Sequence, residues 1–351
     1  MGAKRHNKQQ KKRPAGKRRA NVERSSDPEM PETVDPSTID IPSSYNSLFN
    51  LFSSLREVNL FAFRNETFKR VEKITGRPLI CYVARTSNVP QGVPISIDDS
   101  DLLGFGDLVS TIEGDAVDIL IVSTGGSAEA AERIVRLLRE RFKQVRYIVP
   151  ANAYSAATLI CLSGDEIIMD AVGTLGPIDP QINGIPARAI QRAFEQIEKR
   201  LKDEGPRALT AYMPLIAKYD LHILEMCKSV QELSKELART WLSTYMLKCA
   251  GTDDRLNRAV DFLSDYDIHK SHGRSIGCKQ AQNLCLTATD TATMPELAPL
   301  IRSLYNQYAL WFDKTLFVKM FENAHGISWG RQVQMPSVHL PAGNPPVSTQ
   351  S

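Results

Sequence analysis

A short run of almost uninterrupted apolar residues, VDILIV (117–122), constrains the fold of this chain more than any other segment. A strand with one face in water alternates apolar and polar residues, whereas a parallel strand covered by helices on both faces is apolar throughout. Similar β-prone runs occur at 79–83 (LICYV), 145–149 (VRYIV) and 166–169 (EIIM), and helical patterns separate several of them. This alternation predicts βαβ units and an α/β fold with a parallel sheet.

Several stretches have the apolar spacing of amphipathic helices. The sequence predicts helices over residues 45–74, 128–142 and 187–202, a further one through residues 230–245, and another over 295–323. Because the helices after residue 181 are long, they are expected to form a helical layer on the sheet or to pack against another subunit.

Composition divides the chain into four parts. Residues 1–44 are predicted to be a disordered basic tail and linker, and 45–290 the main folded domain, for which a hydrophobic content of 42% suffices to build a core. A helical segment over 291–330 and a disordered tail over 331–351 follow. The sequence contains no run of eighteen apolar residues and no apolar stretch behind the basic start. It therefore predicts neither a membrane span nor a secretory signal, and a cytoplasmic location is expected.

The basic segment, residues 1–24, differs in charge from the rest of the chain. It carries ten Lys/Arg and one Glu, a net charge of +9 against +3 for the whole protein. It has too few apolar residues to bury a face, so it is expected to be disordered. One hypothesis is that the segment binds nucleic acid or another polyanion through its charge, and the alternative is that it only keeps the protein soluble.

Two strand-to-helix junctions carry the residues of chemical interest. The first contains Gly125 and Gly126, and the second delivers Ser155 at the start of a helix rich in small residues. Glycines can expose backbone N–H groups, and a serine supplies a hydroxyl, so together they could attack a carbonyl and stabilise the resulting oxyanion. Each feature also has a simpler interpretation, as a plain turn or as a helix N-cap serine. Asp165 and Glu166 have no third ligand in a suitable position, so neither a metal site nor a cofactor is predicted.

In this order and separation the segments resemble the serine dehydrogenase proteinase family, ClpP-class serine peptidases of the ClpP/crotonase superfamily that are related to the SppA peptidases. The resemblance covers about residues 79–286. The matching segments are ISIDDSD (95–101), DILIVSTGGSAEAAERIVRLLRE (118–140), VRYIVPANAYSAATLICLSGDEIIMDAVGTLGPIDPQ (145–181) and HGRSIGCKQAQNLCL (272–286). It implies a ClpP/crotonase-like parallel sheet with flanking helices and an α-helical C-terminal layer.

The resemblance also implies residue roles. Ser155 matches the nucleophile of the family, and Gly126 and Ala156 match the residues whose N–H groups form the oxyanion hole. Thr124 and Gly125 lie beside that hole, where an extended peptide substrate would pair with the chain.

The general base is open between three hypotheses. In the first, His272 accepts the proton and Asp179 orients it, with histidine and acid exchanged relative to their positions in ClpP, because triads are defined by geometry and not by chain order. In the second, Lys199 serves as the lysine of a Ser-Lys dyad like that of SppA-type peptidases. In the third, the chain has no functional base.

The resulting functional hypothesis is an ATP-independent serine-type endopeptidase that acts on peptides or unfolded segments, needs no cofactor and forms a homo-oligomer. One alternative is a catalytically silent domain that binds peptides and nucleic acid. It rests on departures from the family pattern, such as Ala157 in place of glycine and HGRS in place of HDYP. The other alternative is a crotonase-like acyl-CoA enzyme, which uses the same pair of N–H groups without a nucleophilic serine.

Overall fold

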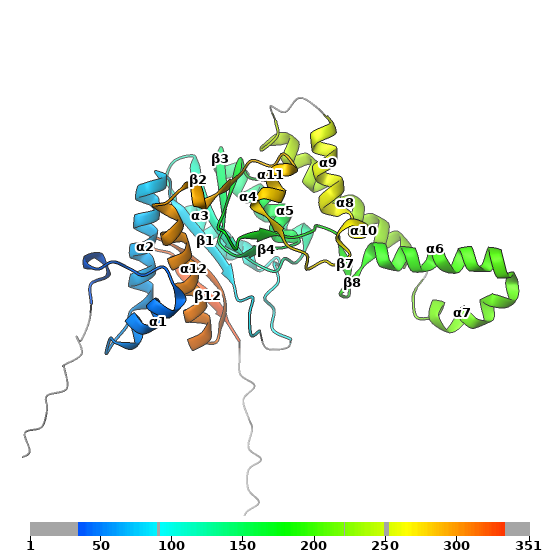
Figure 1. The fold of residues 1–351 in the computed structure, drawn as a ribbon, viewed down its shortest axis with the longest axis horizontal. Helices are drawn as coiled ribbons and strands as arrows, with labels where there is room; N and C mark the ends of the chain where they lie inside the picture. The colour runs from blue at the N-terminus through cyan, green and yellow to red at the C-terminus, as the bar shows by residue number, and fades with distance from the viewer. Residues whose placement is uncertain (1–33, 90–91, 221, 249–252, 334–351) are drawn as a thin grey trace, which may run out of the picture.

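A parallel β-sheet forms the centre of the molecule (Figure 1). The computed structural model describes residues 34–89, 92–220, 222–248 and 253–333. Within these ranges seven strands form one sheet in the order β10-β5-β3-β2-β1-β11-β12. The parallel strands are β1 (Leu79–Ala84), β2 (Ala116–Val122), β3 (Gln144–Val149), β5 (Glu166–Met169) and β10 (Ala288–Asp290). The predicted α/β fold with a parallel sheet is confirmed.

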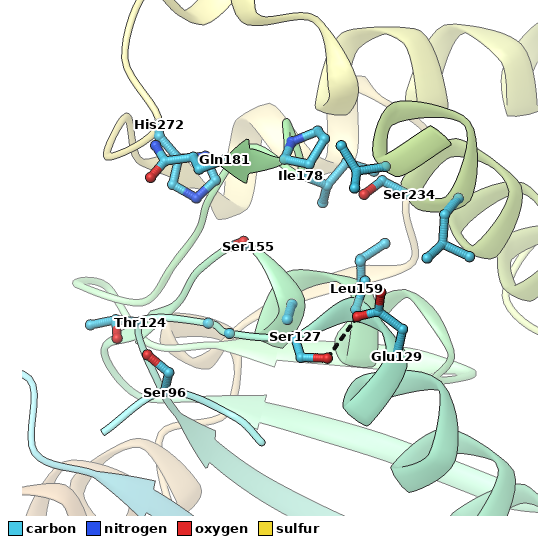
Figure 2. A pocket seen from close by; sticks show the side chains of 17 residues that line it. Ser96, Thr124, Ser127, Glu129, Ser155, Leu159, Ile178, Gln181, Ser234 and His272 are labelled. Atoms are coloured by element: carbon cyan, nitrogen blue, oxygen red, sulfur yellow. Dashed lines mark hydrogen bonds between the residues drawn. The ribbon is translucent and has the colours of Figure 1, made fainter. Parts of the chain in front are cut away.

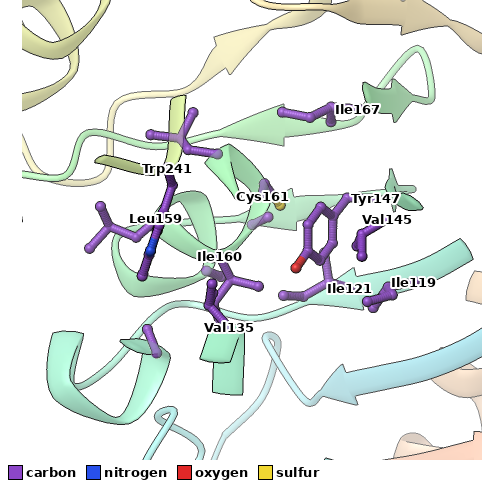
Figure 3. Packing of buried hydrophobic residues seen from close by; sticks show 14 of the residues in the cluster. Ile119, Ile121, Val135, Val145, Tyr147, Leu159, Ile160, Cys161, Ile167 and Trp241 are labelled. Atoms are coloured by element: carbon purple, nitrogen blue, oxygen red, sulfur yellow. The ribbon is translucent and has the colours of Figure 1, made fainter. Parts of the chain in front are cut away.

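Helices cover both faces of the sheet. Ile80 and Tyr82 of β1 pack on one side with α3 (Asp101–Ser110), α4 (Ala128–Arg141) and α5 (Ala156–Leu162). Leu79 and Cys81 pack on the other side with α2 (Leu60–Thr75) and α12 (Leu297–Lys314). Because alternate residues of a strand point to opposite faces, both sets must be apolar. This double coverage explains the continuous apolar runs (Figure 3 shows part of the α5 side).

Asp118 is the polar exception in the run VDILIV, and it is buried in β2. Its two carboxylate oxygens accept hydrogen bonds of 2.9 and 2.7 Å from the guanidinium of Arg146 on the neighbouring strand β3. A buried carboxylate is tolerated when it is paired in this way.

Two predicted helices differ from the structure. The helix expected over 45–74 is divided into α1 (Tyr45–Ser53) and α2, and the side chain of Asn59 caps α2 by accepting a hydrogen bond from the N–H of Ala62. The helix expected over 295–323 begins at Leu297 but ends at Lys314.

The chain then forms strands β11 (Phe317–Asn323) and β12 (Ser328–Gln332), and β11 pairs antiparallel with β1. The segment 291–330 is therefore only partly helical. The physical reason is that the open edge of β1 has unpaired backbone groups, which a β-prone segment such as FVKMF satisfies.

The two long helices predicted after residue 181 are present as α6 (Ala187–Glu204) and α8 (Ile223–Thr244). The sequence analysis did not predict α7 (Leu209–Ile216) or α9 (Asp253–Ser264). Figure 1 shows that α6 and α7 extend away from the sheet, whereas residues of α8 and α9 join the core on the α5 side. No helix in the described ranges combines the length and apolarity needed to cross a membrane.

The remaining elements are short. They are β4 (Asn152–Ala153), β6 (Thr174–Leu175), β7 (Gln181–Ile182), β8 (Ile185–Pro186), β9 (Ile276–Gly277), α10 (Tyr266–His269), α11 (Cys278–Asn283) and the 3₁₀ turns η1 (Pro36–Thr38), η2 (Pro206–Ala208) and η3 (Thr291–Thr293). The basic segment 1–24 and most of the predicted tail 331–351 lie outside the described residues. The division into domains therefore stays a prediction.

Candidate active site

The glycine junction and the serine junction touch each other through their backbones. Gly125 has a φ of +99°, a conformation that favours glycine. A Cβ atom at this position would lie 2.6 Å from the Cβ of Ser155 and 2.6 Å from the carbonyl oxygen of Tyr154. No other residue type fits at Gly125 without displacing Ser155.

Gly126 is held from its other side by Ile97. The N–H of Ile97 donates a 2.8 Å hydrogen bond to the carbonyl oxygen of Gly125, and the N–H of Ser127 donates a 2.9 Å bond to the carbonyl oxygen of Ile97. A Cβ on Gly126 would come within 2.2 Å of that same carbonyl oxygen. Residues 125–127 are thus clamped between Ile97 and the serine junction.

Two N–H groups at these junctions have no protein acceptor. Over the residues that the structure describes, neither the N–H of Gly126 nor that of Ala156 donates a hydrogen bond. Ala156 is the first residue of α5, where backbone N–H groups lack an intrahelical partner. Pre-positioned free donors of this kind can stabilise an oxygen that gains negative charge.

Ser155 occupies a strained turn between β4 and α5. Its φ and ψ are +53° and −119°, a conformation that is costly for a residue other than glycine. The serine stands at the N-cap position of α5, but its side chain makes no capping hydrogen bond. The interpretation of Ser155 as a structural N-cap is therefore wrong. A sharp strand-to-helix turn exposes the nucleophilic hydroxyl in α/β-hydrolases.

His272 and Asp179 lie far apart in sequence and form a close pair. The Nδ1 atom of His272 is 2.9 Å from Oδ1 of Asp179, and the aspartate side chain is only 3% exposed. A carboxylate can only accept, so Nδ1–H of His272 is the donor in this hydrogen bond, and Nε2 is the ring nitrogen that Asp179 does not contact. The structure thus places His272 and Asp179, the two residues of the first hypothesis for the base, in contact.

The loop that carries Asp179 is tied to the helix that follows Ser155. The hydroxyl of Thr158 in α5 donates a 3.0 Å bond to the carbonyl oxygen of Gly176 and accepts a 3.0 Å bond from its N–H. Farther along the loop, the N–H of Ile178 donates to the carbonyl oxygen of Leu263 at 2.8 Å. These bonds fix Asp179 relative to the serine junction.

A cleft of about 430 Å³ is lined by Ser155 and His272 but not by Asp179 or Lys199, and Figure 2 shows it from close by. Ser155 and His272 lie on opposite sides of the cleft, and no hydrogen bond within the described residues joins them. Thr124, Gly125, Gly126 and Ala156 also line it. Eleven lining residues were not assigned to the site by sequence reasoning: Ser96, Ser127, Ala128, Glu129, Leu159, Ile178, Pro180, Gln181, Val230, Leu233 and Ser234.

The newly found lining residues fall into two groups. Ser96 and the other lining residues up to Gln181 belong to segments that resemble the family (95–101, 118–140 and 145–181), so the sequence offered a signal for them. Val230, Leu233 and Ser234 lie on α8, a helix whose amphipathic pattern resembles that of any core helix. Their place in the cleft follows only from how α8 packs.

Lys199 stands apart from the cleft. It is exposed on α6, and it does not line the space around Ser155. Its neighbour Glu198 forms an exposed ion pair of 2.6 Å with Lys202. For Lys199 to act as the base, α6 has to move or a second chain has to supply the lysine, so this hypothesis stays an untested prediction.

Asp165 and Glu166 have partners within the chain. Asp165 accepts hydrogen bonds from the N–H of Val145 at 2.8 Å and from the guanidinium of Arg139 at 3.0 Å. Glu166 accepts a 2.6 Å bond from the hydroxyl of Thr289. Both carboxylates thus fasten the turn before β5 to neighbouring elements.

Two solved structures show limited similarity to this chain. A mutant of a membrane-bound stomatin-specific protease is 18% identical, with a TM-score of 0.33, covering 55% of this chain and 74% of that one. A ClpP1 mutant of Listeria monocytogenes is 14% identical, also with a TM-score of 0.33, covering 62% of this chain and 94% of that one.

Sequence comparisons give the family. An uncharacterized protein of Methanocaldococcus jannaschii is 30% identical over 196 residues, which are 52% of this chain and 67% of the relative. A second uncharacterized protein of that organism is 38% identical over 109 residues, 30% of this chain and 38% of the relative. The model of the ClpP-like SDH-type serine proteinases matches residues 46–240, more than half of the chain. The chain therefore belongs to the ClpP-like SDH-type serine proteinase family.

Proposed function

We propose that this protein is an ATP-independent serine endopeptidase that cleaves peptides or unfolded protein segments. One observation carries the proposal, namely that one cleft and its wall bring together three features. These are the Ser155 hydroxyl, which makes no capping hydrogen bond, the free N–H groups of Gly126 and Ala156, and the His272–Asp179 pair. These are the parts that acyl transfer through a serine nucleophile requires.

In the proposed reaction the Oγ atom of Ser155 attacks the carbonyl carbon of the scissile peptide bond, and Nε2 of His272 takes the hydroxyl proton. The carbonyl oxygen becomes anionic and is stabilised by the N–H groups of Gly126 and Ala156. When the C–N bond breaks, His272 gives its proton to the leaving amine. Water then hydrolyses the acyl ester by the same steps and restores the serine. Asp179 holds the imidazole in the required tautomer.

This reaction requires the imidazole to come within hydrogen-bonding reach of Ser155. Catalytic hydrogen bonds are often long in proteins without substrate and shorten when substrate binds. The 21% exposure of the His272 side chain and its position at the rim of the cleft allow such an approach. Lys199 is the alternative base.

The substrate is proposed to bind in an extended form along residues 124–126. The carbonyl oxygen of Gly125 is already bonded to Ile97, and the N–H of Gly126 is assigned to the scissile carbonyl, so the exposed Thr124 is the residue that remains for pairing. Pairing through the main chain gives affinity without demanding one side chain, which suits unfolded segments.

Reaction with a fluorophosphonate tests the proposal, because only a nucleophilic serine is labelled. Mass spectrometry of the treated full-length protein is expected to find the label on Ser155. A folded protein that takes up no label would contradict the peptidase and support the silent binding domain. Turnover of an acyl-CoA thioester without labelling would instead support the crotonase-like alternative.

A homo-oligomer is proposed from the apolar surface of α7, where Met213 is 52% and Leu215 is 51% exposed. Exposed apolar residues of this density mark contact surfaces. Replacing both residues by glutamate is expected to lower the mass measured by light scattering to that of smaller assemblies. The matched control is Ile74→Glu on α2, where the residue is 41% exposed and distant from α7. An unchanged mass in the double variant would exclude this surface.

The basic segment 1–24 is proposed to bind nucleic acid without sequence preference. Its mechanism would be release of counterions from phosphates, so binding should weaken steeply as salt is raised. Deleting the segment is expected to abolish binding of a labelled duplex and to leave peptidase activity unchanged. Titrations of both proteins at two salt concentrations measure this. Equal affinities would favour the solubilising role. The cytoplasmic location stays a prediction.

A further inference from the structure

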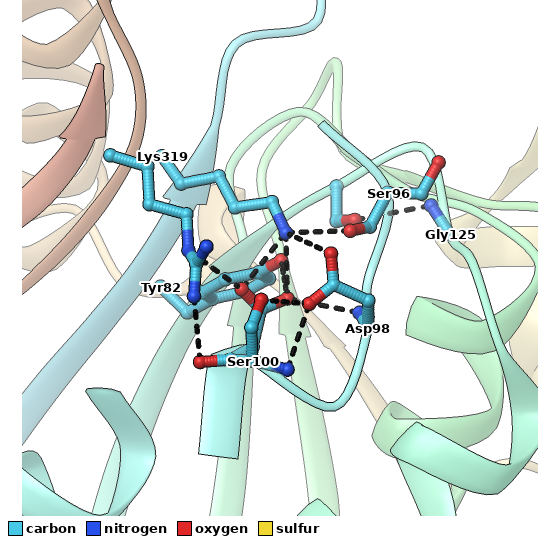
Figure 4. Close-up of polar contacts among 9 residues, drawn as sticks. Tyr82, Ser96, Asp98, Ser100, Gly125 and Lys319 are labelled. Atoms are coloured by element: carbon cyan, nitrogen blue, oxygen red, sulfur yellow. Dashed lines mark hydrogen bonds and ion pairs between the residues drawn. The ribbon is translucent and has the colours of Figure 1, made fainter. Parts of the chain in front are cut away.

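A buried lysine contacts the segment that lies against the glycine junction (Figure 4). Lys319 comes from β11, beyond the part of the chain that matches the family, and its side chain is fully buried. Its ammonium forms a bidentate pair with Asp101, at 2.8 and 2.9 Å from the two carboxylate oxygens. It also donates a 2.6 Å hydrogen bond to the backbone carbonyl oxygen of Ser96.

The partners of Lys319 are themselves held firmly. Asp101 accepts further hydrogen bonds from the hydroxyl of Tyr82 at 2.9 Å and from the N–H of Asp98 at 3.2 Å. Asp98 lies 3.5 Å from the ammonium and is bonded to Ser100. The ammonium therefore has fixed acceptors on three sides, which leaves the carbonyl of Ser96 little freedom to rotate.

Ser96 connects Lys319 to the candidate active site. Ser96 lines the cleft, and the next residue is Ile97, which hydrogen-bonds Gly125 and Ser127 on both sides of Gly126. Rotation of the peptide between Ser96 and Ile97 would turn the N–H of Ile97 away from Gly125. Lys319 thus acts on the orientation of Gly126 through a chain of two backbone contacts.

A buried ion pair is by itself weak evidence of a gain in stability. Burial raises the pKa of the Asp101 carboxyl above its ordinary value, although Lys319 opposes the shift. A carboxyl group whose pKa is raised by folding binds its proton more tightly in the folded chain, so keeping it ionised at neutral pH reduces the free energy of unfolding. Replacing buried ion pairs by uncharged residues is often neutral or stabilising. The hydrogen bond from Lys319 to Ser96 indicates that the pair instead holds the backbone of Ser96 in place.

We propose that Lys319, anchored by Asp101, is a positioning residue that fixes the N–H of Gly126 in the orientation needed to bind the oxyanion. The consequence for catalysis rests on the proposed peptidase function. The consequence for the loop does not, because the hydrogen bonds of Ile97 and Ser127 exist with or without a reaction.

The test uses the full-length double variant Lys319→Met/Asp101→Asn. It replaces the ion pair by neutral side chains of similar size and keeps an acceptor for Tyr82. Hydrogen exchange at the amides of Ile97 and Ser127 is expected to become about tenfold faster, because local opening no longer breaks the bond to Ser96. The kcat for a peptide substrate is expected to fall about 10- to 100-fold with little change in KM, since the lost interaction belongs to the transition state.

The matched control is Arg64→Met/Glu322→Leu. This pair is equally buried, with side chains 1% and 0% exposed, and Glu322 also lies on β11. It does not line the cleft. The control is expected to leave exchange at Ile97 and Ser127, and kcat, unchanged. The single variant Lys319→Arg can still donate to the carbonyl of Ser96 and to the carboxylate of Asp101. It is expected to keep most of the kcat of the unaltered protein.

The outcomes separate the two proposals. If exchange at Ile97 and Ser127 in the double variant equals that of the control, or if exchange rises while kcat does not fall, the positioning role is overturned. If the double variant does not fold, hydrogen exchange is measured on the unaltered protein instead. The positioning role requires the amides of Ile97 and Ser127 to exchange as slowly as the amides of β11, so faster exchange at these two amides would overturn it. If the unaltered protein neither reacts with a fluorophosphonate nor cleaves peptides, the proposed peptidase function is contradicted. Hydrogen exchange at Ile97 and Ser127 still tests whether Lys319 fixes the loop.

Discussion

Replacing Ser155 by alanine is expected to abolish hydrolysis of unstructured proteins such as casein and to leave the fold intact. Loss of a serine nucleophile lowers kcat by about 10⁶-fold where the serine acts with its base as a unit. Because the hydroxyl makes no capping bond in the structure, the free energy of unfolding should change by less than the ~1 kcal/mol of a lost N-cap. Casein hydrolysis and thermal unfolding measure the two effects.

Ser234→Ala is the matched control for this experiment. Ser234 lines the same cleft from α8 and is 3% exposed, but it does not stand at the strand-to-helix turn. This variant should keep most of the activity. Retained turnover in purified Ser155→Ala would remove Ser155 from the mechanism, whereas a loss in both variants would indicate that the cleft is sensitive to any change.

Replacing His272 by alanine is expected to lower kcat about 10²-fold or more, while Lys199→Ala has little effect. A general base contributes about this much to proton transfer. The activity of the unaltered protein should rise with pH as the imidazole loses its proton, because only the neutral ring accepts one. Rates measured over a pH series for the three proteins test this expectation.

Asp179→Asn adds a second test of the same base. The amide can turn its acceptor away from Nδ1, so the imidazole loses the partner that selects its tautomer. The rate should fall by a large factor without loss of the fold. The reverse ranking of His272→Ala and Lys199→Ala would support the Ser-Lys dyad, and full activity in all three variants would leave the chain without either base.

Local pattern carried much of the fold prediction. The burial of VDILIV on both faces follows from residue type alone, and EIIM forms β5 with the expected bounds. The same pattern could not identify β11, because apolar residues at 317–321 fit the end of a helix as well as a strand. Only pairing with β1, more than two hundred residues earlier in the chain, decides between them.

The candidate site divides in the same way. The glycine pair after a strand and the serine before a helix are local features, and the sequence by itself determined that both junctions exist. Three other features depend on how distant segments pack. They are the contact between the two junctions, the absence of a capping hydrogen bond from the Ser155 side chain, and the pairing of His272 with Asp179. Sequence periodicity reports which side of an element is buried and not what lies against it.

The sequence by itself thus determined the α/β class, the strands that are buried on both faces and the two strand-to-helix junctions that contain Gly125–Gly126 and Ser155, because these follow from interactions within a strand or a helix turn. Tertiary structure alone decided which base candidate lies at the cleft and that Lys319 reaches Ser96 across 223 residues of chain. The physical reason is that a side chain's partners are set by the packing of whole elements, and that packing places residues together irrespective of their separation in sequence.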